Sequence, residues 1–170
     1  MQVRGLFLAV VILAAWGVGQ IASAQEPQSI GVFNEWVAYT YQAGGEKICY
    51  IGSQPTKDEG AYADRGDIWT LVTHRSPGLK GVVSVVMGYN FKEGADATVK
   101  IGSKTFSLFT QGDTAWTKRP EDDQALVAAM KAGNSMEVRG VSWRGTETKD
   151  TYSLSGFTKA YEAITTACGG

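Results

Sequence analysis

The chain has 170 residues, 44% of them hydrophobic and 19% charged, which is enough apolar material for one domain with a buried core. Its 16 basic and 17 acidic residues give a formal net charge of −1, so the composition offers no basic surplus for binding nucleic acid or anionic lipid. The 21 glycines, with only 4 prolines, indicate short strands joined by tight turns.

The first 24 residues have the pattern of a secretory signal peptide. Arg4 supplies a positive charge, Leu6 to Val18 is an uncharged apolar run, and Ala22-Ser23-Ala24 places small residues at a cleavage site. The run is shorter than the ~20 residues that a membrane-spanning helix needs. We therefore predict cleavage after Ala24 and a periplasmic or secreted domain, residues 25–170, with no stable membrane insertion. An uncleaved membrane anchor is the alternative interpretation.

The first half of this domain predicts four strands. Trp36 to Gln42 and Lys47 to Ser53 form a hairpin around a glycine-containing turn. The polar stretch from Gln54 to Arg65 is predicted to be a surface loop. Asp67 to His74 has strand composition. Val82 to Phe91 is apolar at its centre, so we expect it to cross the middle of a sheet with both faces covered.

The second half predicts two hairpins and two helices. The hairpins pair Thr98–Ile101 with Lys104–Thr110, and Met136–Arg144 with Thr148–Leu154. Between them, a helix begins at Pro120, has acidic residues in its first turn, and ends near Gly133. A terminal helix runs from Phe157 to Thr165, with Ser155 as its N-cap. Together these elements predict a mainly antiparallel β-sandwich or flattened barrel with one internal helix and a short C-terminal helix.

The two cysteines, Cys49 and Cys168, lie near opposite ends of the predicted mature chain. In an oxidising compartment an even number of cysteines favours a disulfide. Closing a loop of roughly 120 residues would contribute about 4–5 kcal/mol in the chain-entropy model. Two free thiols remain the alternative. A catalytic thiol pair is disfavoured because the two residues lack Cys-x-x-Cys spacing.

The sequence predicts no catalytic residue, metal ligand or cofactor. His74, the only histidine, could act as a general base, but the sequence places no nucleophile or acid beside it. Ser155 lacks the G-x-S-x-G pattern of a nucleophilic serine. Four acidic residues could form a carboxylate pair or a calcium site, but they lack the spacing of a calcium loop, which favours a solvated surface. They are Asp58, Glu59, Asp64 and Asp67.

Aromatic residues are the best candidates for binding. Six of them could line a ligand groove, although most are expected in the core: Trp36, Trp69, Tyr89, Trp116, Trp143 and Tyr152. Trp116 stands out because it precedes the first helix outside any obvious strand. Trp143 and Arg144 lie at a predicted hairpin tip, where this pair would suit protein contact. The alternative there is a cross-strand pair that only stabilises the sheet.

Several segments resemble the invasion-associated locus B (IalB) family of secreted alphaproteobacterial proteins. They are Cys49–Pro55, Gly88–Phe91, Ile101–Phe106, Leu108-Phe109, Ala115-Trp116, and Asp150–Phe157 followed by Ala160 and Cys168. The resemblance covers nearly the whole mature chain. It implies a β-sandwich-like fold, export, a disulfide between the two matching cysteines and, in some relatives, a link to host-cell entry. Many members carry an additional cysteine pair where this chain has Gln111 to Trp116, which indicates a divergent branch.

The leading hypothesis is a non-enzymatic periplasmic or secreted protein that binds an envelope or host protein, through Trp116, Trp143 or Arg144. A small-molecule or glycan binder with an aromatic-lined cleft is the second hypothesis. A hydrolase that uses His74 and the loop carboxylates is the third. The sequence does not specify the partner or the oligomeric state.

Overall fold

The computed structural model describes residues 25–169, so the predicted signal peptide lies outside the described residues. The described chain contains strands β1 (Gln28–Phe33), β2 (Trp36–Ala43), β3 (Glu46–Ser53), β4 (Lys57–Gly60), β5 (Trp69–Ser76), β6 (Val82–Val86), β7 (Ala97–Ile101), β8 (Lys104–Gln111), β9 (Thr114–Trp116), β10 (Ser135–Val141) and β11 (Glu147–Ser153). It also contains helices α1 (Pro120–Ala132) and α2 (Phe157–Ala167). The predicted three hairpins and two helices are all present.

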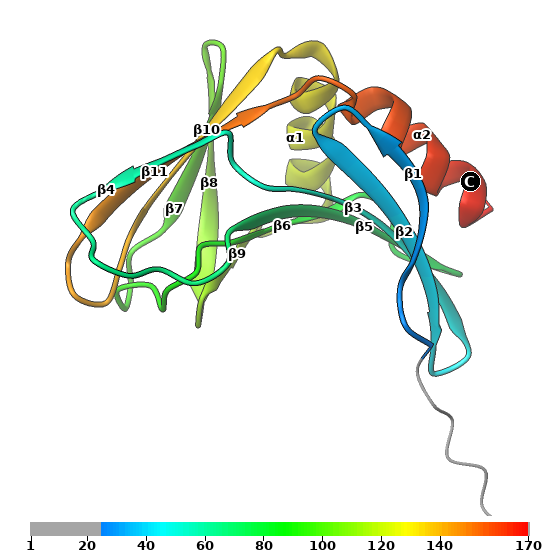
Figure 1. Ribbon diagram of the computed structural model, residues 1–170, viewed down its shortest axis with the longest axis horizontal. Helices are drawn as coiled ribbons and strands as arrows, with labels where there is room; N and C mark the ends of the chain where they lie inside the picture. Colours follow the sequence, from blue (N-terminus) through cyan, green and yellow to red (C-terminus); the bar gives the residue numbers. More distant parts are fainter. Residues whose placement is uncertain (1–24, 170) are drawn as a thin grey trace, which may run out of the picture.

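All strands belong to one antiparallel sheet with the order β1-β2-β3-β5-β6-β9-β8-β7-β10-β11-β4. Figure 1 shows that this sheet is bent into two layers that meet near β8 and β9, and that α1 and α2 lie above the lower layer. In the described part of the chain the end strands β1 and β4 do not pair with each other. The mainly β, sandwich-like fold is therefore confirmed, whereas the alternative of a closed, flattened barrel is wrong.

The core is assembled from the inner face of the sheet and the two helices. The fully buried Trp36 of β2 packs edge-on against Phe157 of α2, with ring centroids 5.0 Å apart. Its indole Nε1–H donates to the carbonyl of Ser153 at the end of β11, at 3.0 Å. A buried Asp123 on α1 accepts a 2.9 Å hydrogen bond from the backbone N–H of Val83 in β6. These contacts join both sheet layers and both helices into one packed unit.

Three strands were missed by sequence reasoning. The edge strand β4 lies inside the predicted polar loop and pairs with β11, from Lys57 opposite Thr151 to Gly60 opposite Thr148. Its residues Lys-Asp-Glu-Gly show no apolar alternation, because an edge strand with one open side needs charges that discourage further pairing. The strands β1 and β9 were also not predicted. Trp116 therefore lies in a strand, in contrast to the expectation.

The long strand expected from Val82 to Phe91 ends at Val86. Its burial alternates, with Val83 and Val85 buried and Val82, Ser84 and Val86 partly exposed, so only one face is fully covered. The strand cannot continue because Gly88 adopts a left-handed conformation with φ of +67°. Its carbonyl accepts a 2.9 Å hydrogen bond from the backbone N–H of Gly66, which joins two separate loops.

The N-cap of α2 is Gly156, not Ser155 as predicted. Gly156 has a φ of +90°, and a Cβ at this position would lie 1.9 Å from the carbonyl oxygen of Phe33. Only glycine fits so close to the β1–β2 turn. The hydroxyl of Ser155 instead accepts a 2.8 Å hydrogen bond from Asn34 Nδ2 in that turn.

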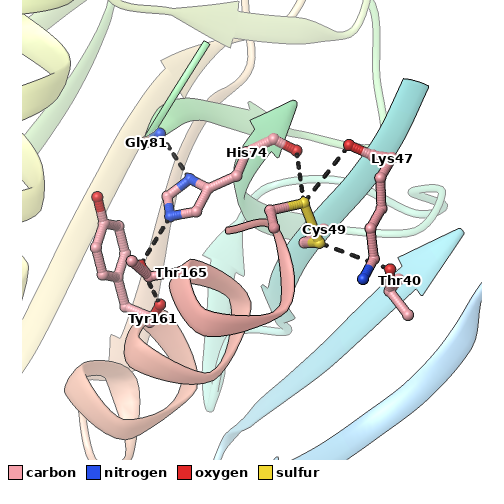
Figure 2. The surroundings of a disulfide bond; sticks show 8 residues. Thr40, Lys47, Cys49, His74, Gly81, Tyr161 and Thr165 are labelled. Atoms are coloured by element: carbon pink, nitrogen blue, oxygen red, sulfur yellow. Dashed lines mark hydrogen bonds between the residues drawn. A yellow bond between two sulfur atoms is a disulfide. The ribbon is translucent and has the colours of Figure 1, made fainter. Parts of the chain in front are cut away.

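A disulfide joins Cys49 on β3 to Cys168 directly after α2 (Figure 2). The two Cα atoms are 6.0 Å apart, and the residues are 119 positions apart in the sequence. The bond fastens the end of α2 against β3 and β5, and the alternative of two free thiols is wrong.

Candidate functional site

The turn between β10 and β11 presents Trp143 and Arg144. The side chain of Trp143 is 62% exposed, although tryptophan is usually well buried. The Arg144 guanidinium carbon lies over the indole ring, 4.8 Å from its centroid. The backbone is held in place, because Trp143 N–H donates to the carbonyl of Asn90 at 2.8 Å and Gly145 N–H donates to that of Ser142 at 2.7 Å. The indole is therefore displayed on an anchored turn.

Beside this turn lies a cleft of about 500 Å³. We call it the Trp143 cleft. Its walls are the loop 61–66, Gly88 and Tyr89 after β6, and residues 142–148 around the β10–β11 turn. The Tyr89 hydroxyl and Thr148 Oγ1 on the cleft wall are hydrogen-bonded at 2.6 Å. Three segments that are far apart in the sequence thus enclose one polar hollow with Trp143 and Arg144 at its rim.

A buried ion pair holds the cleft together. The guanidinium of Arg65 donates two hydrogen bonds to Asp150 on β11, from Nη1 to Oδ1 at 2.7 Å and from Nη2 to Oδ2 at 2.6 Å. Arg65 Nε–H also donates to the carbonyl of Met87 at 2.6 Å. The side chains of Arg65 and Asp150 are only 3% and 0% exposed. Loop 61–66 is therefore attached to both β11 and the end of β6.

Two aromatic rings flank the buried guanidinium. The Arg65 guanidinium carbon lies 5.0 Å from the centroid of Tyr89 and 5.4 Å from that of Tyr62. The Tyr62 hydroxyl in turn donates a hydrogen bond to Asp58 on β4. Burial raises the pKa of the Asp150 carboxyl, and the hydrogen bonds and charge of Arg65 oppose this rise. The arrangement fits a rigid support for the cleft, with its charges directed inward.

The other candidate aromatic residues do not gather at this cleft. Trp116 is partly exposed on β9 and stacks on Phe109 of β8, with centroids 5.6 Å apart, and it does not line the cleft. Trp36 and Tyr152 are fully buried in the core. Tyr89 lines the Trp143 cleft, whereas Trp69 lines a separate groove on the outer face of the sheet.

His74 lies buried between β5 and α2, next to the disulfide (Figure 2). Its Nδ1 accepts a 2.8 Å hydrogen bond from the backbone N–H of Gly81. Its Nε2 lies 3.0 Å from Thr165 Oγ1, and that hydroxyl donates to the carbonyl of Tyr161 at 2.8 Å. These partners assign a neutral imidazole with its proton on Nε2, and burial lowers the pKa of His74. Nε2 is engaged by α2 and Nδ1 by the β5–β6 connection, so neither ring nitrogen is free, which argues against a general base.

The acidic residues of the predicted loop are partly used in the structure. Glu59 on β4 forms ion pairs with Lys57 at 2.9 Å and Lys149 at 2.8 Å. Within residues 25–169, no three His, Cys, Asp or Glu side chains come together in a way that could hold a metal ion. The carboxylates thus do not converge with His74 on a common site.

Sequence reasoning found Trp143 and Arg144 but missed Arg65 and Tyr62. Arg65 and Asp150 are 85 positions apart, and each looks like an ordinary surface charge in the sequence. Their pairing is visible only in the fold, where the loop that follows β4 lies against β11. Asp150 does carry one weak signal in the sequence: in a strand it shares a face with Thr148 and Tyr152, two residues away on either side. The structure shows that all three residues on this face are buried.

The family model described as "Invasion associated locus B (IalB) protein" matches residues 36–165, from the start of β2 almost to the end of α2. No curated protein and no solved structure matches the chain. The match spans the elements that form the core, the disulfide-bearing strand β3 and the whole Trp143 cleft. The chain therefore belongs to the invasion associated locus B family.

Proposed function

We propose that this protein is exported and acts without catalysis, by binding a protein partner through Trp143 and Arg144. Family membership supports this proposal, because the family is described as invasion associated. We therefore include host-cell surface proteins, besides proteins of the bacterial envelope, among the candidate partners. Neither described helix is long and apolar enough to cross a membrane.

The observation that carries the proposal is the exposure of Trp143 on an anchored turn. Tryptophan and arginine are the residue types that most often dominate binding energy at protein interfaces. An indole that is 62% exposed gains hydrophobic free energy when a partner covers it. The partner should therefore offer an apolar pocket for Trp143 and a carboxylate for Arg144. Because the turn is already held in place, binding loses little conformational entropy there.

Export is the first part to test. The signal-peptide pattern predicts that the protein isolated from its native host begins at Gln25 and carries a disulfide between Cys49 and Cys168. Fractionation followed by mass spectrometry of the intact protein measures both properties. An intact chain found only in the cytosol, with Met1 retained and both thiols reduced, would contradict the proposal.

Binding is tested with purified components. Proteins that crosslink to the turn should be identified by mass spectrometry, expressed separately and titrated against the wild-type protein. Trp143→Ala should raise the Kd about tenfold or more, equivalent to ~1.4 kcal/mol. Leu79→Ala is the matched control, because Leu79 is another large apolar side chain that is exposed, to 56%, outside the cleft. A partner that binds both variants as tightly as the wild type would disprove the role of Trp143.

A further inference from the structure

A second hollow lies on the outer face of β2, β3 and β5, separate from the Trp143 cleft. Residues alternate between the two faces of these strands. Ala38, Ile51 and Val72 are buried in the core. Tyr39, which follows Ala38, and Leu71, which precedes Val72, lie on the opposite face and are only partly buried. Between these outward-facing side chains lies a groove of about 530 Å³. We call it the tyrosine groove.

Aromatic rings form most of its walls. Tyr39 and Tyr50 are cross-strand partners, and their rings stack with centroids 5.0 Å apart and an interplanar angle of 18°. Tyr41 meets Tyr50 edge-on, with centroids 6.1 Å apart. Trp69 on β5 completes the aromatic lining. The groove therefore offers flat, partly exposed ring faces.

A glycine keeps the groove open. A Cβ at Gly52 would lie 3.0 Å from Leu71 Cδ2 and 3.5 Å from Trp69 Cε3. A larger residue at this position would push both side chains aside or fill the space between them. The absent side chain at position 52 is thus what allows Trp69 and Leu71 to frame a hollow on an otherwise continuous sheet face.

The polar groups that line the groove are uncharged, except for the guanidinium of Arg75, which is paired with a carboxylate. Three tyrosines of the lining, Tyr39, Tyr41 and Tyr50, carry hydroxyls that can donate and accept hydrogen bonds. Burial, with the neighbouring tyrosines, raises the pKa of Tyr50, so its phenol stays protonated and can donate. The one charged lining residue, Arg75, lies 3.9 Å from the carboxylate of Glu46. The groove thus combines apolar ring faces, tyrosine hydroxyls and little net charge.

We propose that the tyrosine groove binds a neutral carbohydrate of about two linked pyranose rings. The axial C–H groups of a pyranose form a flat apolar face whose partial positive charge suits the negative face of an aromatic ring. Its hydroxyls both donate and accept, as the tyrosine hydroxyls do. The volume of the groove is typical of small-ligand sites. This site is independent of the contact proposed for Trp143, which lies in a different hollow.

The test is a titration of the purified oxidised protein with cellobiose, maltose and N,N′-diacetylchitobiose, followed by amide and indole NMR signals. At least one disaccharide should cause saturable shifts confined to β2, β3 and β5 and to the Trp69 indole. Trp69→Ala should weaken binding by about tenfold or more. Trp116→Ala is the matched control, because Trp116 is a partly exposed tryptophan on the same sheet outside the groove, and it should leave the affinity unchanged.

Two further variants separate binding from folding. Gly52→Ala should reduce affinity by placing a methyl group between Leu71 and Trp69. The spectrum should remain that of the folded protein, because only the end of the Leu71 side chain, 3.0 Å from the new Cβ, needs to shift. Replacing Tyr39, Tyr41 and Tyr50 together by Phe keeps the rings and removes the hydroxyls, and should also weaken binding. Absence of shifts with all three sugars, or shifts that map to the Trp143 cleft, would overturn the proposal.

Discussion

Removing either partner of the buried Arg65–Asp150 pair should strongly destabilise the protein. Asp150→Leu leaves a guanidinium that is 3% exposed without its carboxylate, and Arg65→Met leaves a carboxylate that is fully buried without its cation. Breaking such a pair from one side costs about 3–5 kcal/mol, because the remaining charge is neither solvated nor neutralised. Arg65→Met also removes the 2.6 Å hydrogen bond from Nε to the Met87 carbonyl. We expect each single variant to lose about 3–5 kcal/mol of unfolding free energy.

The double variant Arg65→Met/Asp150→Leu provides the control. It removes both charges and fills the space with apolar side chains of similar size, so it should be more stable than either single variant. Its unfolding free energy should lie within about 1–2 kcal/mol of the wild type, which makes the two substitutions strongly non-additive. A simple sum of the two losses would mean that lost packing, and not charge burial, accounts for the single effects.

The measurement is urea unfolding of the oxidised protein, followed by tryptophan fluorescence and circular dichroism, with equal slopes required for all variants. For a domain of this size, each kcal/mol lowers Tm by about 2–4 °C, so the single variants should melt roughly 6–20 °C below the wild type. A single variant that remains within about 1 kcal/mol of the wild type would refute the reasoning, because it would show that water or another group stabilises the remaining charge.

Three further predictions concern the rest of the fold. Replacing Cys49 and Cys168 together by Ser should lower the unfolding free energy by up to about 4–5 kcal/mol, since a 119-residue separation is no longer closed, and should accelerate hydrogen exchange in Phe157–Ala167; unchanged exchange there would argue against the tether. Burial lowers the pKa of His74, so as the pH falls the unfolded chain takes up this proton before the folded protein does. The contribution of His74 to stability should therefore be constant above pH ~6.5 and fall below it, and urea titrations of His74→Gln should lack this part of the pH dependence. Gly88→Ala should cost ~2 kcal/mol or more in a thermal melt, because its φ is +67° and a Cβ would lie 2.3 Å from the Gly66 carbonyl oxygen; a Tm equal to that of the wild type would mean that the two loops separate easily.

The two hollows differ in how they are built. The Trp143 cleft depends on a buried ion pair and on loops from three parts of the chain. The tyrosine groove depends on cross-strand register, which places Tyr39 opposite Tyr50, and on the missing side chain at Gly52. Variants of Arg65 should therefore disturb the cleft and leave the groove intact, whereas Gly52→Ala should do the reverse.

The sequence by itself determined the elements whose signal is local. The hairpin of β7 and β8 follows from a Gly-Ser turn between alternating residues, and α1 follows from Pro120 and the acids of its first turn. These features need only neighbours within a few positions, so periodicity and turn chemistry suffice to predict them. Trp143 and Arg144 were identified for the same reason, because a turn between two clear strands displays its residues.

Only the tertiary structure decided which distant residues meet. The polar edge strand β4 has no pattern of its own and exists because β11 supplies its hydrogen bonds. The loop that follows β4 places Arg65 against Asp150 of β11, and Gly156 replaces Ser155 as the cap of α2 because the Phe33 carbonyl approaches so closely. The physical reason is the same in each case: the free energy that selects these arrangements comes from burial and pairing between segments separated by many residues, and a local pattern carries no record of it.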